Sequence, residues 1–396
     1  MNTYKAINNI LVSFIHDKPP ILPENLDYNK LYELSKAHNI DGIVGYVSDK
    51  YNCFEDSPIK QKLSLSYINA LTINTNKTYL FDVLSKQLAK KNIDVITFKG
   101  YCVKKLYPVP ELRAFSDVDI LIKESDRQRV HDNMLNSDFK CEVDYGNVYN
   151  YRKGIEYYEF HTTLISEDVL ESEKLYDYFY SAFEHVKKAS GNVKEFEDEF
   201  HLIYLISHIA KHIYYGGAGI RMYLDIALFV KEKSETFDFD HFLNTTKQLE
   251  FDKFACTVIK ASCEWFSVNI PAVIDNAVSI DNETMTALYS FTLDKGIFGN
   301  TMSSSGEATV QLMKKKGSKH PKLASAISLV FPSMNTMKLK YAYLNKAPFL
   351  LPFAWIHRFF SNLGKIKSRK QKLHDIIATD NNNVSKHQTL LKNIGL

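Results

Sequence analysis

Two acidic residues interrupt an apolar run in the stretch Ser116-Asp117-Val118-Asp119-Ile120-Leu121-Ile122. Side chains two apart in a β-strand share a face, so Asp117 and Asp119 should point one way while Val118 and Ile120 face the core. Neighbouring carboxylates repel each other unless a cation lies between them, and hard oxygen ligands select Mg²⁺ or Mn²⁺. The stretch therefore predicts a buried strand that carries a divalent metal site.

A second apolar stretch, residues 93–98, ends in Lys99 and Gly100 and is typical of a buried strand followed by a turn. Glycine lets a backbone approach a ligand closely, and the start of the short helix that should follow offers free N–H groups to a phosphate. Arg113 and Ser116 lie just before or at the acidic pair. Basic and hydroxyl side chains beside a metal site suit a triphosphate, so we expect these residues to bind one.

Short elements alternate around these stretches. A helix is expected at residues 125–135, and strands are expected at residues 141–145 and 154–164. Apolar residues at spacings of three and four occur before residue 90 and return after residue 195, with helices expected at residues 200–214 and 222–231. The pattern predicts an α+β fold, in which a small mixed β-sheet is flanked by largely helical N- and C-terminal regions.

Composition excludes several classes of protein. The 396 residues are 45% hydrophobic and 24% charged, a globular balance that rules out a disordered or fibrous chain. No apolar run approaches the roughly 20 residues that span a bilayer, and residues 1–20 contain no stretch typical of a signal peptide. Five scattered cysteines without a CxxC pair predict reduced thiols. We therefore expect a cytoplasmic protein without a transmembrane segment.

Charge is distributed unevenly along the chain. Residues 308–374 contain 14 Lys and Arg and no Asp or Glu, although the net charge of the whole chain is only +3. Such asymmetry indicates an anionic partner for this segment. Three interpretations stay open: a helical layer packed on the acidic remainder, a site for a polyanionic acceptor such as tRNA, or a surface that touches an anionic membrane.

The order of the motifs resembles a known family. The elements Phe98-Lys99-Gly100, Leu106-Tyr107-Pro108, Leu112-Arg113 and Ser116 to Ile122 follow one another as in the bacterial family described only as uncharacterised nucleotidyltransferase. That family belongs to the DNA polymerase beta-like nucleotidyltransferase superfamily. The resemblance implies transfer of a nucleoside monophosphate from an NTP, ATP by default, to a hydroxyl or phosphate acceptor. The acceptor stays open among a small molecule, a sugar phosphate, a protein and a tRNA.

The resemblance also implies Mg²⁺ or Mn²⁺ as cofactor and a third acidic residue beside Asp117 and Asp119. Glu159 fits that place in the strand Glu156-Tyr157-Tyr158-Glu159-Phe160-His161. We therefore expect all three carboxylates to be catalytic metal ligands, with Glu159 as ligand or general base. His161 shares a face with Glu159, where it would bind phosphate, orient Glu159, or simply be a hydrogen-bonded strand residue.

A stripe of histidines follows in the expected helix at residues 200–214. His208 and His212 are four residues apart and therefore neighbours on one helical face, with His201 near the same stripe. The family has a histidine pair here and then Arg-x-x-x-Asp, which matches Arg221 and Asp225. In one interpretation these two residues form an ion pair along their helix; in the other, His212 and Arg221 close over the nucleotide.

The resemblance divides the chain into four parts. We expect an N-terminal helical region at residues 1–85, a nucleotidyltransferase core at 86–190, a helical domain that closes the cleft at 191–298, and a basic helical segment at 308–396.

Two other functions compete with transfer. One is a catalytically inactive nucleotide-binding or scaffold protein, against which the intact acidic pair at residues 117 and 119 argues. The other is a metal-dependent phosphohydrolase built on His208, His212, Asp225 and Glu159. That function would leave the Lys99-Gly100 turn and Arg113 without a role.

Overall fold

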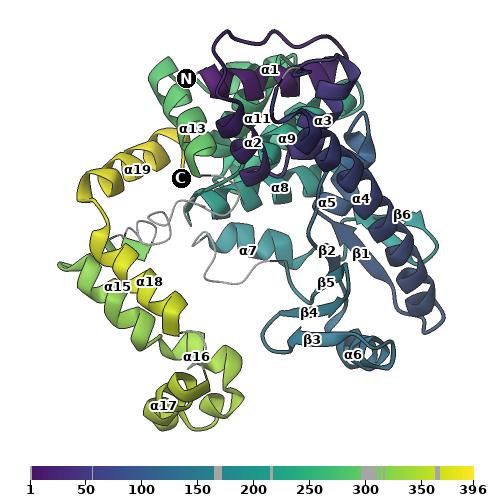
Figure 1. Ribbon diagram of the computed structural model, residues 1–396. Coiled ribbons are helices and arrows are strands. Elements are labelled where there is room, and N and C mark those ends of the chain that lie inside the picture. Colours follow the sequence, from purple (N-terminus) through teal and green to yellow (C-terminus); the bar gives the residue numbers. More distant parts are fainter. Residues whose placement is uncertain are drawn as a thin grey trace.

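The computed structural model describes residues 2–55, 57–164, 172–214, 217–295, 309–310, 313–314, 317–361 and 366–396. Within these residues, a seven-stranded mixed sheet lies among many helices (Figure 1). The strand order is β3-β4-β5-β2-β1-β7-β6. The fold is α+β, as the sequence predicts. The strands are β1 (Val95–Phe98), β2 (Val118–Leu121), β3 (Lys140–Val143), β4 (Val148–Lys153), β5 (Glu156–His161), β6 (Val186–Ser190) and β7 (Val193–Phe196).

Helices form most of the remaining described chain. Those before and within the sheet region are α1 (Asn2–His16), α2 (Tyr28–Ala37), α3 (Asp41–Lys50), α4 (Lys60–Ala89), α5 (Gly100–Val103), α6 (Arg127–Asn136) and α7 (Glu173–Tyr180). Those after it are α8 (Asp198–Tyr214), α9 (Ile220–Lys233), α10 (Phe239–Gln248), α11 (Asp252–Phe266), α12 (Ala272–Ala277) and α13 (Asn282–Lys295). The C-terminal helices are α15 (Pro321–Val330), α16 (Met334–Lys340), α17 (Leu351–Ser361), α18 (Ile366–Ala378) and α19 (Asn381–Ile394).

Strand pairing is mixed around β2. This strand pairs antiparallel with β1 and parallel with β5, and β1 in turn pairs parallel with β7. Parallel neighbours need long connections, so β5 and β7 lie beside strands that occur far earlier in the chain. Side chains on neighbouring strands of this sheet therefore come from segments that are distant in sequence.

The sheet separates two hydrophobic cores. On one face, Val118 and Ile120 of β2 pack with Phe81 of α4 and Met134 of α6. On the other face, Phe98 of β1 belongs to the larger core that α8, α9 and α11 form with the N-terminal helices. Val118 and Ile120 thus face a core, as predicted, and Asp119 is directed to the opposite face, where α8 lies.

Several strands are absent from the sequence-based prediction. The strand expected at residues 154–164 is shorter, because Gly154 has φ +58° and turns the chain between β4 and β5. The sequence does not predict the hairpin partner β4 or the pair β6 and β7; β6 carries two exposed lysines, Lys187 and Lys188. Pairing with β1 holds β7 in the sheet, so the sheet continues to Phe196, beyond the expected core of residues 86–190.

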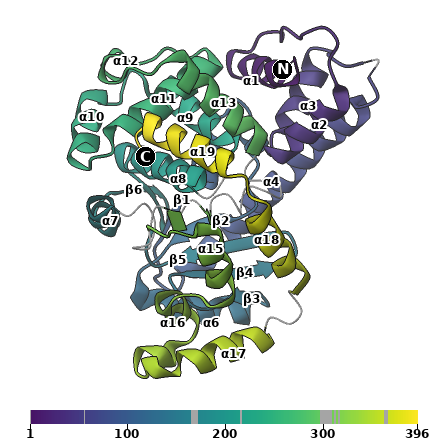
Figure 2. The ribbon, with the colours of Figure 1, turned by 90° about the vertical axis from the view of Figure 1, so that its left-hand side faces the viewer.

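The C-terminal helices α15 to α18 project from the rest of the protein, and the last helix, α19, packs against it. Helices α15 to α18 extend beside the sheet, and α19 packs back against α11 and α13 (Figures 1 and 2). Among the described residues, no helix combines the length and the apolar character needed to cross a membrane.

His38 is a buried link between the N-terminal helices and the helical layer. Its Nδ1 accepts a hydrogen bond from the amide of Ile220 at 3.2 Å, and its Nε2 donates to the carbonyl of Leu293 at 3.1 Å. Burial lowers the pKa of His38 to about 4 against the opposing effect of the Leu293 hydrogen bond, and the charge of Arg221 lowers it further. His38 is therefore neutral in the folded protein at ordinary pH.

We predict that the free energy of unfolding falls as the pH drops from about 6.5 towards 4. In this window the unfolded chain binds a proton at His38 and the folded chain does not, so acid favours unfolding. The shift corresponds to a loss of roughly 3 kcal/mol at the acid end. Urea unfolding across this range should show the slope, which His38→Gln should reduce by the contribution of one bound proton and the exposed control His320→Gln should leave unchanged. Equal slopes in wild type and His38→Gln would contradict the assignment.

Candidate active site

The register between two parallel strands builds the site. Asp119 of β2 is paired with Glu159 of β5, and the next pair on the same face joins Leu121 to His161. On the other side of β2, Asp119 is paired with Phe98, which directly precedes Lys99. Paired residues of neighbouring strands point to the same face, so the sheet places Asp119, Glu159 and His161 together.

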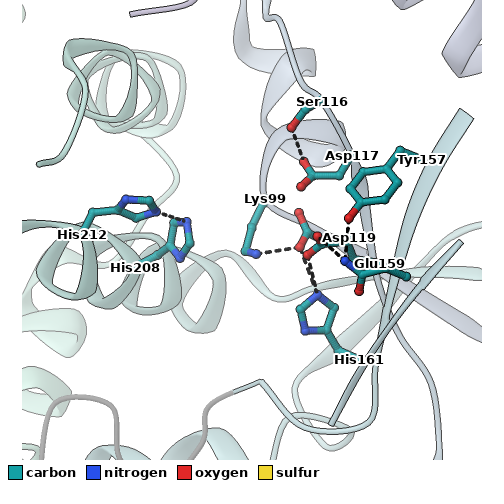
Figure 3. A network of polar contacts seen from close by, with 10 residues as sticks. Lys99, Ser116, Asp117, Asp119, Tyr157, Glu159, His161, His208 and His212 are labelled. Atoms are coloured by element: carbon teal, nitrogen blue, oxygen red, sulfur yellow. Dashed lines mark hydrogen bonds and ion pairs between the residues drawn. The ribbon is translucent and has the colours of Figure 1, made fainter. Parts of the chain in front are cut away.

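Asp119 is the central acceptor of this cluster (Figure 3). Lys99 Nζ donates to Asp119 Oδ1 at 2.6 Å, and His161 Nε2 lies 3.0 Å from the same oxygen. An ionised carboxylate only accepts hydrogen bonds, so His161 Nε2 must carry the hydrogen. His161 also lies 3.8 Å from Glu159 Oε2, while Asn150 Nδ2 donates to Glu159 Oε1 at 3.1 Å.

The two carboxyl groups differ in electrostatic environment. Burial alone would raise the pKa of Asp119, but the charge of Lys99 and the hydrogen bond from His161 outweigh it and lower this pKa to about 2. Burial, followed by the charges of Asp119 and Asp117, raises the pKa of Glu159 to about 7. Asp119 is therefore ionised at neutral pH. The negative charges around Glu159 instead favour its protonated form.

This arrangement corrects one expectation. The sequence placed Asp117 and Asp119 as a repelling pair, but Asp119 is neutralised by Lys99 at a position where both side chains are largely buried. Asp117 is half-buried and accepts a hydrogen bond from Ser116 Oγ at 3.1 Å. The two aspartates therefore differ in their contribution to stability.

The turn after β1 has an unusual backbone. Lys99 has φ +56° and ψ −134°, a conformation that residues with side chains rarely adopt. At the next residue, a Cβ on Gly100 would lie 2.5 Å from Arg113 Nη1. Gly100 is thus needed for the close packing of Arg113, and the turn aims Lys99 at Asp119.

Arg113 forms a buried ion pair with Asp225 of α9. Its Nε and Nη2 donate to the two carboxylate oxygens at 3.1 and 2.5 Å, and Tyr107 donates to Asp225 Oδ1 at 2.6 Å. Arg221 donates instead to the carbonyl of Ala114. Asp225 therefore pairs with Arg113 of the loop before β2, and not with Arg221 of its own helix as one interpretation of the sequence had it.

Helix α8 covers the acidic cluster from the other side. His208 and His212 lie with their Nε2 atoms 3.2 Å apart, and the His208 ring stacks on Tyr204 at 6.2 Å between centroids. Burial and the charge of Lys99 lower the pKa of His208 well below its usual value. His201 is not part of this contact and lies against Phe196. In Figure 3 the histidine pair and Asp119 lie on opposite sides of the Lys99 side chain.

One pocket of about 320 Å³ brings together every site residue predicted from the sequence. Those residues are Lys99, Gly100, Arg113, Ser116, Asp117, Asp119, Glu159, His161, His212 and Arg221. Lys211 of α8 also lines it, and Asn150 of β4 holds Glu159. Sequence reasoning missed both: β4 was not predicted, and no signal distinguished Lys211 from an ordinary helix-surface lysine.

The donor set fits a divalent cation. Ligand atoms of Asp119, Glu159 and His161 lie within 4.8 Å of one another. Carboxylate oxygens suit Mg²⁺ or Mn²⁺, and a cation would offset the repulsion between Asp119 and Glu159. The sequence had grouped Asp117 with these carboxylates; the structure adds His161 to the cluster and places Asp117 beside it in the pocket.

The fold and the site define a class: an α+β protein with an acidic cluster, able to hold a metal ion, in a basic and polar pocket on one face of a mixed sheet. A family model described as uncharacterised nucleotidyltransferase matches residues 24–267, and the chain belongs to this family. The resemblance seen in the motifs between Phe98 and Ile122 is thereby confirmed. No curated protein and no solved structure matches the chain.

Proposed function

We propose that the protein transfers a nucleoside monophosphate from an NTP to a hydroxyl or phosphate acceptor in a metal-dependent reaction. The observation that carries this proposal is the β2–β5 register, which aligns Asp119 with Glu159 beside Lys99 in the pocket. Family membership supports nucleotidyl transfer as the general activity. ATP serves as the default donor.

The acidic residues would hold the metal ion. We assign Asp119 and Glu159 as ligands, Asp117 as a further carboxylate at the pocket wall, and His161 as the donor that orients Asp119. A bound Mg²⁺ or Mn²⁺ would supply charge neutralisation for the triphosphate and the acceptor oxygen.

Basic and hydroxyl groups would bind the triphosphate. Lys99 and Ser116 line the pocket next to the acidic cluster, and His212 and Arg221 line it from α8 and α9. Arg113 is committed to Asp225, so we assign it to positioning the loop before β2 rather than to direct phosphate contact. The helices of residues 191–298 would then close the cleft over the nucleotide.

The reaction has a simple balance. The acceptor oxygen forms a bond to the α-phosphorus, while the bond from that phosphorus to the bridging oxygen breaks and pyrophosphate leaves with the electron pair. Where the acceptor is a hydroxyl group, its proton passes to a base, for which Glu159 is the assigned group.

The competing phosphohydrolase has less support. Among the described residues, the group whose ligand atoms are close enough to hold a metal ion is Asp119, Glu159 and His161, and it includes neither His208 nor Asp225. The carboxylate of Asp225 already accepts hydrogen bonds from Arg113 and Tyr107. The four residues of the hydrolase hypothesis line one pocket, but among the described residues His208, His212 and Asp225 are not in the group whose ligand atoms lie close enough together to share a metal ion.

A labelling experiment tests the function. The protein is incubated with Mg²⁺, a cell lysate and each NTP in turn, labelled at the α-phosphate to follow the acceptor and, in a parallel reaction, at the γ-phosphate to follow the leaving group. Lysate without the protein gives the blank that is subtracted, and products are separated by size and charge. We expect one labelled acceptor together with released pyrophosphate. Orthophosphate without a labelled acceptor would indicate a hydrolase, and nucleotide binding without either product would indicate a binding protein; each outcome rejects the proposal.

A further inference from the structure

The C-terminal arm, defined as helices α15 to α18, lies outside the residues that the family model matches. Both views show α17 at the end of the arm farthest from the N-terminal helices (Figures 1 and 2). The proposed transfer reaction gives this arm no task. Its surface therefore calls for a separate explanation.

The inner side of α17 is fixed by packing. Ala354 is fully buried in a small core with Met337, Tyr341 and Leu344. Trp355 Nε1 donates to the carbonyl of Pro332 at 3.0 Å. These contacts orient the helix, so the opposite side has a defined direction.

The outer side of α17 is apolar as well. Four residues of α17, together with Phe349 in the turn just before it, are named the outer apolar face. They are between 55% and 78% exposed: Phe349, Phe353, Ile356, Phe359 and Phe360. Contiguous exposed apolar surface on a folded protein marks an interaction site. The arm alone leaves this face uncovered.

A hollow continues the same surface. It has a volume of about 690 Å³ and lies between the end of α15, α17 and α18. Leu329, Trp355 and Phe359 are among its lining residues, and the cations of Arg358 and Lys370 lie there too. An apolar hollow with cations beside it fits a ligand that is apolar in one part and anionic in another.

Charge narrows the choice of partner. The sequence from residue 308 to 374 has 14 basic and no acidic residues, and Lys340, Lys346 and Lys370 are exposed. A polyanion such as RNA would complement the charge, but it would leave Ile356 and the phenylalanines in water. An anionic bilayer surface complements both the charge and the apolar face.

We propose that the arm docks on anionic membrane surfaces. The outer apolar face enters the boundary between headgroups and acyl chains, and the arm's lysines lie against anionic headgroups. This inference does not depend on the proposed transfer reaction.

Vesicle flotation with the full-length protein tests the proposal. We expect binding to vesicles that contain phosphatidylglycerol, weak binding to vesicles of phosphatidylcholine alone, and loss of binding as salt is raised. No binding to phosphatidylglycerol vesicles at low salt rejects the proposal. So does binding to RNA without binding to vesicles.

Apolar variants test the outer face. Phe353→Gln and Phe360→Gln should each reduce vesicle affinity by about tenfold, because each phenylalanine loses its transfer out of water. The matched control is the pair Leu65→Gln and Ile68→Gln on α4, where both side chains are 53% exposed. If the control reduces binding as much, the effect is not specific to the arm and the proposal fails.

Charge variants test the electrostatic part. Lys340→Gln and Lys346→Gln should each reduce affinity about fivefold at low salt. Lys86→Gln in α4 and Lys90→Gln directly after it, both at exposed positions, should leave it unchanged. Size-exclusion chromatography of Phe353→Gln adds a second criterion: conversion of a dimer to a monomer, without any vesicle binding by wild type, would assign the face to a second copy of this chain.

Discussion

Asp119→Asn should reduce the proposed nucleotidyl transfer on the order of a thousandfold, because it removes the carboxylate that we propose as a metal ligand at the centre of the acidic cluster. It should also destabilise the protein. Lys99 would keep its charge in a largely buried position without the carboxylate 2.6 Å away, at a cost of roughly 2–4 kcal/mol. Transfer assays with labelled NTP and urea unfolding at pH 7 measure the two effects separately.

The neighbouring aspartate supplies the comparison. Asp117→Asn should also impair transfer, but it should leave the unfolding free energy within about 0.5 kcal/mol. Asp117 is half-buried, and among the described residues its side chain is hydrogen-bonded only to Ser116. Asp138→Asn, at an exposed site, should change neither quantity. Full transfer activity in Asp119→Asn would overturn the site, and equal unfolding free energies for Asp117→Asn and Asp119→Asn would overturn the role of Lys99.

Asp225→Ala should lower the unfolding free energy by about 3–5 kcal/mol. It leaves the guanidinium of Arg113 buried without its counter-charge and removes the acceptor for the Tyr107 hydroxyl. Burial tends to lower the pKa of Arg113, but the charge of Asp225 more than offsets it and raises this pKa, so Arg113 stays charged. Chemical denaturation at pH 7 provides the measurement.

Two further variants test whether the loss of stability comes from breaking the buried Arg113–Asp225 ion pair or from the removal of any acidic charge. Glu250→Gln breaks the exposed ion pair with Lys174 and should cost at most about 1 kcal/mol. The double variant Arg113→Met/Asp225→Leu removes both charges and should recover part of the loss seen in Asp225→Ala. If the loss of stability in the double variant equals the sum of the losses in Arg113→Met and Asp225→Leu, the two residues do not act as a pair.

Local sequence determined the strands that carry the acidic residues. The alternation around Asp119 required one face of β2 to be apolar, and Val118 and Ile120 are buried there. Local sequence also predicts the turn after β1, because Lys99 and Gly100 directly follow a β-branched apolar run. The motif order from Phe98 to Ile122 also sufficed to place the chain in its family.

Tertiary structure alone decided which side chains meet. Glu159 was expected beside the aspartates from the family resemblance, but the parallel register of β2 and β5 fixed its partner as Asp119 and brought in His161. Arg113 and Asp225 are far apart in sequence and come from different elements, so no local pattern predicts their ion pair. Periodicity reports which face of a strand or helix is buried; it carries no information on which distant segment covers that face.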